Sequence, residues 1–261
     1  ELSQIIEQGS AQVHQAECPV SSSLVPGDAG EAPHSKLKRS LHELAAAHGA
    51  DASAVKEVPL KRWEDYGDLV LVPGGWVTAA PWSALPEKEV WECVGRSLGK
   101  VRVAVKEEID AGPMRQSHVR IAHPEGCADG WVQTTQHGLH YEWDVTKVMF
   151  SRGNVNERRR MGKLSAAGET FVDLFAGIGY FTVPMLAGSG AAKGYACEWN
   201  PDSVEALKRN LKRNGVDGRC EVFLGDNKES AKGLKNIADR VLLGLLPSSE
   251  AAWPLAVACL R

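Results

Sequence analysis

The sequence predicts an α/β fold, in which a doubly wound parallel-sheet domain follows a small α+β domain. From residue 151 onward, apolar runs of strand length alternate with segments of helical periodicity, which is typical of a parallel sheet with helices on both faces. A glycine-rich turn follows the first of these strands, as in doubly wound folds. All Trp, Phe and Tyr residues lie between Trp63 and Trp253, so the segment before them can hardly build a core of its own.

Composition restricts the class of protein. The chain has 261 residues, of which 43% are apolar and 24% charged, and this excludes collagen-like and wholly disordered chains. No apolar run is long enough for a transmembrane helix, so we expect no membrane partner. The net charge of −3 means that any nucleic-acid surface must be a local patch. The chain starts at Glu1 without a signal peptide, and we expect it to be a fragment.

The six cysteines are dispersed along the chain. None forms a C-x-x-C pair, and no His/Cys cluster has zinc-ligand spacing, so we expect no metal site. Dispersed cysteines in a chain of this length indicate free thiols in a reducing compartment. We therefore expect a cytoplasmic protein.

Three segments follow from the order of these patterns. Residues 1–58 read as a linker-like segment with one amphipathic helix over residues 35–48, which Gly49 would end. Residues 59–150 form the small α+β domain, with a helix over residues 86–98. Its expected strands lie near residues 69–72, 101–105, 119–121, 131–133 and 139–141.

Residues 151–261 form the α/β domain. Its expected strands cover residues 170–175, 193–198, 220–224 and 240–246. A helix over residues 201–213 places Val204, Leu207 and Leu211 on one side and its basic residues on the other. Because the chain stops soon after the fourth strand, we expect this domain to be truncated at its C-terminus.

The turn after the first strand carries the motif Asp173-x-x-x-Gly177-x-Gly179. Glycines let a ligand approach the backbone, and the helix that follows offers free N–H groups. The dinucleotide fingerprint needs a third small residue, and Thr182 occupies that position. The acid before the glycines instead resembles the first motif of class I S-adenosylmethionine-dependent transferases. The plainer alternative is an ordinary strand-to-helix turn.

Acidic residues also end the next two strands. Glu198 follows Asp173 by 25 residues and could accept hydrogen bonds from both ribose hydroxyls of a nucleoside. Asp226 and Asn227 end the third strand, where a carboxylate beside an amide could bind an adenine edge. Each could instead be a helix N-cap, but three acids in register with a glycine-rich turn favour a Rossmann-like nucleoside-cofactor site.

A basic segment precedes the first strand. Residues 145–163 contain six basic residues and one acidic residue, and Asn154 with Glu157 resembles a capping pair that opens a helix. The segment is either a solvated basic face or a functional one. In the functional interpretation Ser151 or Arg158 contacts the amino-acid end of the cofactor, and Arg152, Arg159 and Arg160 contact phosphates.

The turn after the fourth strand would border the acceptor substrate. Many amine methylases hold the acceptor nitrogen there with an Asn or Asp side chain before proline. In this chain Gly244 occupies the position of that Asn or Asp.

Taken together, these motifs resemble the Trm5/TYW2 family of tRNA position-37 enzymes over roughly residues 60–261. The segments that carry the resemblance are Trp63 with residues 67–69, and residues 144–151, 154–161, 173–181, 198–201 and 238–247. Carried over position by position, the cofactor contacts of the family fall on Ser151, Arg158, Glu198, Asp226 and Asn227.

The resemblance implies an activity. Residues 244–250 and the Asp226-Asn227 pair are similar to the branch of the family that transfers an aminocarboxypropyl group from S-adenosylmethionine to the tricyclic 4-demethylwyosine base of tRNA(Phe), in wybutosine biosynthesis. The implied partner is thus tRNA(Phe), and DNA is not expected. No residue is assigned as a catalytic base.

Two alternatives stay open. The first is guanine-37 N1 methylation with the same cofactor; those methylases keep Asn-Leu-Pro, and this chain departs from that pattern at Gly244. The second is a module that binds cofactor or tRNA without catalysis.

Overall fold

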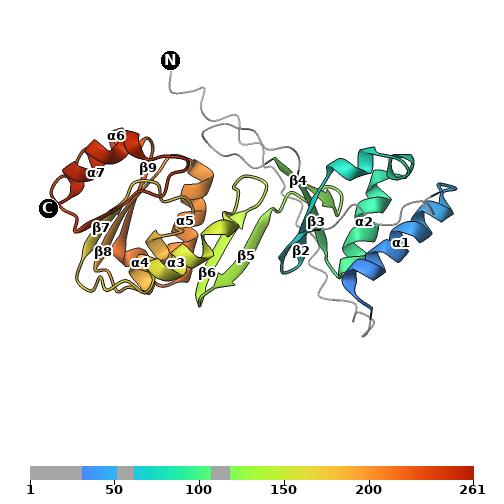
Figure 1. Cartoon of the computed structure of the whole chain (residues 1–261), viewed down its shortest axis with the longest axis horizontal. Helices are drawn as coiled ribbons and strands as arrows, with labels where there is room; N and C mark the ends of the chain where they lie inside the picture. The colour runs from blue at the N-terminus through green and yellow to red at the C-terminus, as the bar shows by residue number, and fades with distance from the viewer. Residues whose placement is uncertain (1–30, 52–61, 107–117) are drawn as a thin grey trace, which may run out of the picture.

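Two sheets and a hairpin organise the chain in the computed structural model, which describes residues 31–51, 62–106 and 118–261. Figure 1 shows the four-stranded parallel sheet with its helices at one end, the N-terminal sheet with α1 and α2 at the other, and the β5–β6 hairpin between them. The expected α/β domain preceded by a small α+β domain is confirmed. The expected domain limits at residues 58/59 and 150/151 stay predictions.

The N-terminal sheet has the strand order β1-β2-β3-β4. Its strands and helices are α1 (Pro33–Ala47), β1 (Glu64–Tyr66), β2 (Leu69–Pro73), α2 (Glu87–Leu98), β3 (Arg102–Lys106) and β4 (Val119–His123), with 3-10 turns η1 (Gly75–Thr78) and η2 (Trp82–Ala84). Strands β2 and β3 are parallel, and the outer pairs are antiparallel. Strand β1 was not expected from the sequence, because three polar or aromatic residues carry no alternation.

Helix α1 packs against α2 and contributes to the core of this domain. Its residues Leu37, Leu41 and Ala45 are fully buried in a cluster with Trp91 and the apolar side chains of β2 and β3. Gly49 follows the helix with a φ of +70°, as a helix-ending glycine does. The amphipathic spacing predicted this helix, but its docking depends on residues far away in the chain.

The parallel sheet has the strand order β10-β7-β8-β9. The elements of this region are η3 (Arg152–Asn154), α3 (Val155–Met161), β7 (Thr170–Asp173), α4 (Thr182–Ala187), β8 (Lys193–Glu198), α5 (Pro201–Arg213), η4 (Asp217–Arg219), β9 (Cys220–Leu224), α6 (Asn227–Ser230), β10 (Arg240–Leu242), η5 (Glu250–Ala252) and α7 (Trp253–Cys259). All its strand pairs are parallel, so the carboxyl ends of the four strands lie at one edge.

Helices cover both faces of this sheet. Phe171 points into one apolar cluster with Leu207 and Leu211 of α5, whereas its neighbour Val172 points into another with Ala256 of α7. Successive strand residues alternate between faces, and here both faces are apolar. The doubly wound arrangement expected from the alternation of patterns is therefore confirmed.

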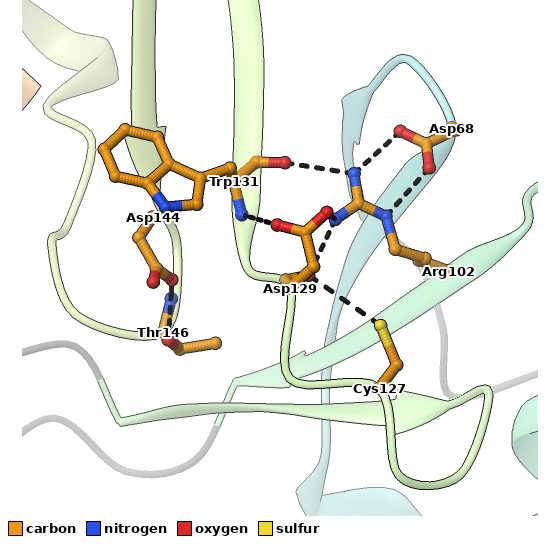
Figure 2. A network of polar contacts seen from close by, with 7 residues as sticks. All are labelled: Asp68, Arg102, Cys127, Asp129, Trp131, Asp144 and Thr146. Carbon is orange, nitrogen blue, oxygen red and sulfur yellow. Dashed lines mark hydrogen bonds and ion pairs between the residues drawn. The ribbon is translucent and has the colours of Figure 1, made fainter. Parts of the chain in front are cut away.

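The β5 (Trp131–Gln136) and β6 (Leu139–Asp144) hairpin connects the two sheets. Figure 2 shows how its start is held: Arg102 of β3 is 7% exposed and donates to both carboxylate oxygens of Asp68, to the Asp129 carbonyl and to the Trp131 carbonyl. On the neighbouring strand at the same end of the hairpin, Trp143 packs edge-on against Tyr66 of β1, with ring centroids 5.0 Å apart. The hairpin thus shares a core with both sheets.

Four cysteines, Cys93, Cys197, Cys220 and Cys259, are free thiols as expected. Cys127 is disulfide-bonded, so the expectation of free thiols throughout is wrong at that residue, because the positions of cysteines in a sequence do not reveal which of them pair. Among the described residues no helix is long and apolar enough to cross a membrane.

Candidate functional site

A cavity of about 380 Å³ lies at the carboxyl edge of the parallel sheet. Residues that follow all four strands line it, and so does the segment before α3; they include Ser151, Glu198, Asp226, Asn227 and Gly244. Open α/β sheets bind ligands at this edge. Four of the five residues expected to contact a cofactor therefore lie around one cavity, and the fifth, Arg158, does not line it.

The glycine-rich turn forms the floor of the cavity. Asp173, at the end of β7, is fully buried and accepts hydrogen bonds from the Thr182 hydroxyl at 2.8 Å and from the Phe175 N–H at 3.2 Å. Burial without a cationic partner raises the pKa of Asp173 to about 6. Asp173 therefore shapes the turn from below and is not among the residues that line the cavity.

Glu198 ends β8 and faces the glycine-rich turn. One carboxylate oxygen accepts from the Gly177 N–H at 2.7 Å, and the other accepts from the Asn200 N–H at 2.8 Å. Each carboxylate oxygen has two lone-pair directions, so both oxygens can accept a further hydrogen bond from a ligand. The two backbone donors fix the orientation of the carboxylate, and a cis-diol is a ligand that suits it.

Asp226 and Asn227 follow β9 and have structural partners of their own. Asp226 caps α6 through a hydrogen bond from the Lys228 N–H at 2.9 Å, as the alternative interpretation expected. The Asn227 amide donates to the Leu174 carbonyl at 2.9 Å. Both residues also line the cavity, so capping and ligand contact are compatible at this strand end.

The segment at Ser151 is held by two aromatic rings and a buried arginine. The Ser151 N–H donates to the Tyr180 hydroxyl at 3.0 Å, and that hydroxyl donates to the Met149 carbonyl. Arg158 is 2% exposed, donates to the Ser151 carbonyl at 2.8 Å, and lies over the rings of Phe150 and Tyr180. This arrangement fixes the backbone of Ser151, whose side chain borders the cavity.

Arg158 has no carboxylate partner among the described residues. It also donates a hydrogen bond to the Gln136 side chain at 2.6 Å, and burial lowers its pKa. A cation beneath the cavity wall favours a negative group of a ligand on the other side. Arg158 therefore positions Ser151, to whose carbonyl it donates a hydrogen bond.

Asn154 was expected to pair with Glu157 as a helix cap, and this expectation is wrong. The Asn154 side chain makes no capping hydrogen bond, and Glu157 binds Arg160 instead at 2.6 Å. Asn154 lines the cavity, and so do Trp199 and Tyr180. The sequence could not identify these three residues as cavity residues, because Asn is also a common helix cap and Trp and Tyr are also common core residues.

Gly244 follows β10 at the end of the cavity nearest β7. A Cβ built there would lie 2.9 Å from the Phe181 ring, so any side chain would force that ring to move. The polar side chain that amine methylases place in this turn has no room in the present packing. After Gly244, the same segment lines the cavity with the apolar residues Leu245 and Leu246 and with the hydroxyl-bearing Ser249.

Comparison with known proteins places these features in a family. Residues 133–261 match the model of the TRM5/TYW2 methyltransferase domain. The chain is 43% identical over 233 residues to the human tRNA wybutosine-synthesizing protein 2 homolog, covering 89% of this chain and 51% of that protein. The chain thus spans about half the length of this curated relative.

Two solved structures share the fold over most of the chain. The structure of P. horikoshii TYW2 in complex with MeSAdo is 28% identical, with a TM-score of 0.68, and covers 86% of this chain and 76% of that one. The structure of M. jannaschii TYW2 in complex with AdoMet is 26% identical, with a TM-score of 0.56, and covers 77% and 72%.

Proposed function

Because this chain belongs to the TRM5/TYW2 family, we propose that it transfers the aminocarboxypropyl group of S-adenosylmethionine to the tricyclic 4-demethylwyosine base at position 37 of tRNA(Phe). The observation that carries the proposal is a single cavity that joins the Gly177 turn, Glu198 and the Asp226-Asn227 pair to a Gly244 turn without a polar side chain. Relatives named for wybutosine synthesis support the substrate class.

The residues around the cavity fit S-adenosylmethionine. Glu198 has two oriented oxygens for the ribose hydroxyls, and Asp226 and Asn227 supply polar groups for the adenine. The amino-acid end then lies toward the Gly177 turn and Ser151. The buried charge of Arg158 favours the carboxylate of that end without contacting it, because Arg158 does not line the cavity.

The donor supplies a sulfonium whose γ-carbon is electrophilic. In the proposed transfer a carbon of the base forms a bond to this γ-carbon, the carbon–sulfur bond breaks with its electron pair on sulfur, and the base loses a proton. The protein contributes mainly orientation, which alone can supply about 7–11 kcal/mol. Gly244 itself supplies no side chain that would hold an acceptor nitrogen against the methyl carbon.

Binding of tRNA belongs to the proposal as well. Arg159 is exposed on α3 and has no ion-pair partner among the described residues, whereas Arg160 pairs with Glu157, and Arg152 lies 3.5 Å from Glu64. Of the expected basic patch, Arg159 is therefore most available to a phosphate. A cytoplasmic location is also part of the proposal; the free thiols at Cys93 and Cys197 favour it, whereas the disulfide at Cys127 does not.

Label transfer tests the proposed reaction. The chain is incubated with tRNA carrying the tricyclic base and with S-adenosylmethionine labelled either in its carboxyl carbon or in its methyl group. We expect only the carboxyl label to reach the tRNA. Methyl label in the tRNA would favour methylation, and the absence of both labels, with the cofactor bound, would favour a module that binds without catalysis.

A further inference from the structure

A second cavity lies beside the end of the parallel strands β2 and β3 in the N-terminal sheet. Its volume is about 590 Å³, and it is lined by Arg62, Trp63, Glu64, Pro73, Lys106 and Arg152, among others. The strand register accounts for this gathering, since Glu64 pairs with Leu71 and Pro73 pairs with Lys106 across neighbouring strands. Residues from four separate parts of the chain therefore meet here.

The lining of this second cavity is positive, although the whole chain carries a net charge of −3. It holds three cations, Arg62, Lys106 and Arg152, and one carboxylate, Glu64, which gives +2. Arg152 lies 3.5 Å from Glu64, and among the described residues Arg62 and Lys106 have no ion-pair partner. Lys106 is half-buried and lines the cavity. Such a concentration of cations attracts phosphate groups.

Trp63 adds an aromatic surface to the same cavity. It is half-buried, it packs against the apolar cluster of α1 and α2, and its ring centroid is 5.8 Å from that of His34. Packing of this kind holds the indole in place while part of it lines the cavity. Fixed aromatic rings beside cations are the usual platform on which proteins stack the bases of single-stranded nucleic acid.

One short turn connects the two cavities. Ser151 and Asn154 line the cofactor cavity, whereas Arg152, which directly follows Ser151 in the turn, lines the second cavity. Ser151 is anchored to Tyr180 of the glycine-rich turn, so this wall between the cavities is fixed. A polynucleotide that places one base in the first cavity would have its neighbouring nucleotides next to the second.

We propose that the second cavity is a nucleotide subsite for the RNA substrate, in which Trp63 stacks a base near the modified one and Arg62, Lys106 and Arg152 bind its phosphates. This inference rests on the proposed function, because it takes the ligand of the first cavity to be a base in RNA. Arg62, Trp63 and Lys106 lie outside the basic segment of residues 145–163, whereas Arg152 belongs to it.

The test is the salt dependence of RNA binding, measured with labelled tRNA(Phe) by fluorescence anisotropy. Arg62→Ala and Lys106→Ala should each lower the slope of log affinity against log salt by about 0.7 to 1, because each removes one phosphate contact. Lys235→Ala is the matched control, since it removes an exposed cation that lines neither cavity. Its slope should equal that of the parent chain.

Two Trp63 variants test the stacking. Trp63→Leu should weaken tRNA binding by about five-fold or more, whereas Trp63→Phe, which keeps an aromatic face, should stay close to the parent. Thermal unfolding and calorimetry with S-adenosylmethionine establish that each variant is folded with an intact first cavity. Loss of affinity in both Trp63 variants alike would contradict a stacking role.

Unchanged salt slopes in Arg62→Ala and Lys106→Ala would overturn the subsite. The proposed function could fail separately, if the parent chain bound tRNA but transferred no carboxyl label. In that case the slopes of the variants relative to Lys235→Ala would still decide whether RNA occupies the second cavity.

Discussion

Substitution of Glu198 by glutamine is the sharpest test of how the cofactor cavity works. Both Glu198 oxygens accept from backbone N–H groups, of Gly177 and Asn200, and both are available to a ribose diol. In Glu198→Gln two charge-assisted ligand bonds become weaker or are lost, at about 1 kcal/mol each. The sum of about 2 kcal/mol predicts S-adenosylmethionine binding about 30-fold weaker.

Isothermal titration calorimetry of the parent chain and the variant measures this loss directly. Glu205→Gln is the matched control, because Glu205 is an exposed acid of α5 that pairs with Arg209 and does not line the cavity. The control should bind like the parent. A Glu198→Gln affinity within three-fold of the parent, with an unchanged melting temperature, would refute the assignment of Glu198 to the ribose.

Three further predictions concern charge. Burial raises the pKa of Asp173 to about 6, so the native state holds this proton more tightly than the unfolded chain, and the associated stability is present at about pH 4 and lost as the pH rises through about 6. The free energy of unfolding of Asp173→Asn, measured in urea, should therefore rise relative to the parent by about 2 kcal/mol from about pH 4 to about pH 7; a pH-independent difference would exclude this titration. Arg158→Lys should lower the free energy of unfolding by about 2 kcal/mol and weaken cofactor binding, because one ammonium cannot replace the fork to Ser151 and Gln136; a stable variant with parental affinity would remove its positioning role. Arg159→Ala should reduce the salt slope of tRNA binding by about 1, and Arg160→Ala by less, because Glu157 already holds Arg160; equal slopes for all three proteins would leave α3 a solvated face.

The sequence was sufficient for the parallel sheet and most of its edge. Alternation of apolar strands and amphipathic helices predicted β7, β8, β9 and α5, since these patterns depend on local periodicity. The spacing of Glu198 and Asp226 predicted their place at the sheet edge, because parallel strands end on the same side. Both residues do line the cavity.

Long-range contacts explain what the sequence could not predict. Asn154 lines the cavity because of how the turn before α3 lies over the sheet. In the sequence alone, an asparagine in this position looks the same as one that caps a helix. Arg158 is buried between two aromatic rings that come from different segments. The contact of Arg102 with Asp68 and the β5 hairpin likewise joins residues far apart in the chain.

The by-product of the reaction tests the central claim most directly. Transfer through the γ-carbon leaves methylthioadenosine, whereas transfer of the methyl group leaves S-adenosylhomocysteine. After incubation with S-adenosylmethionine and tRNA carrying the tricyclic base, chromatography of the small molecules should find methylthioadenosine in amounts that match the modified tRNA. S-adenosylhomocysteine together with methylated guanosine 37 would contradict the account and assign the chain to methylation.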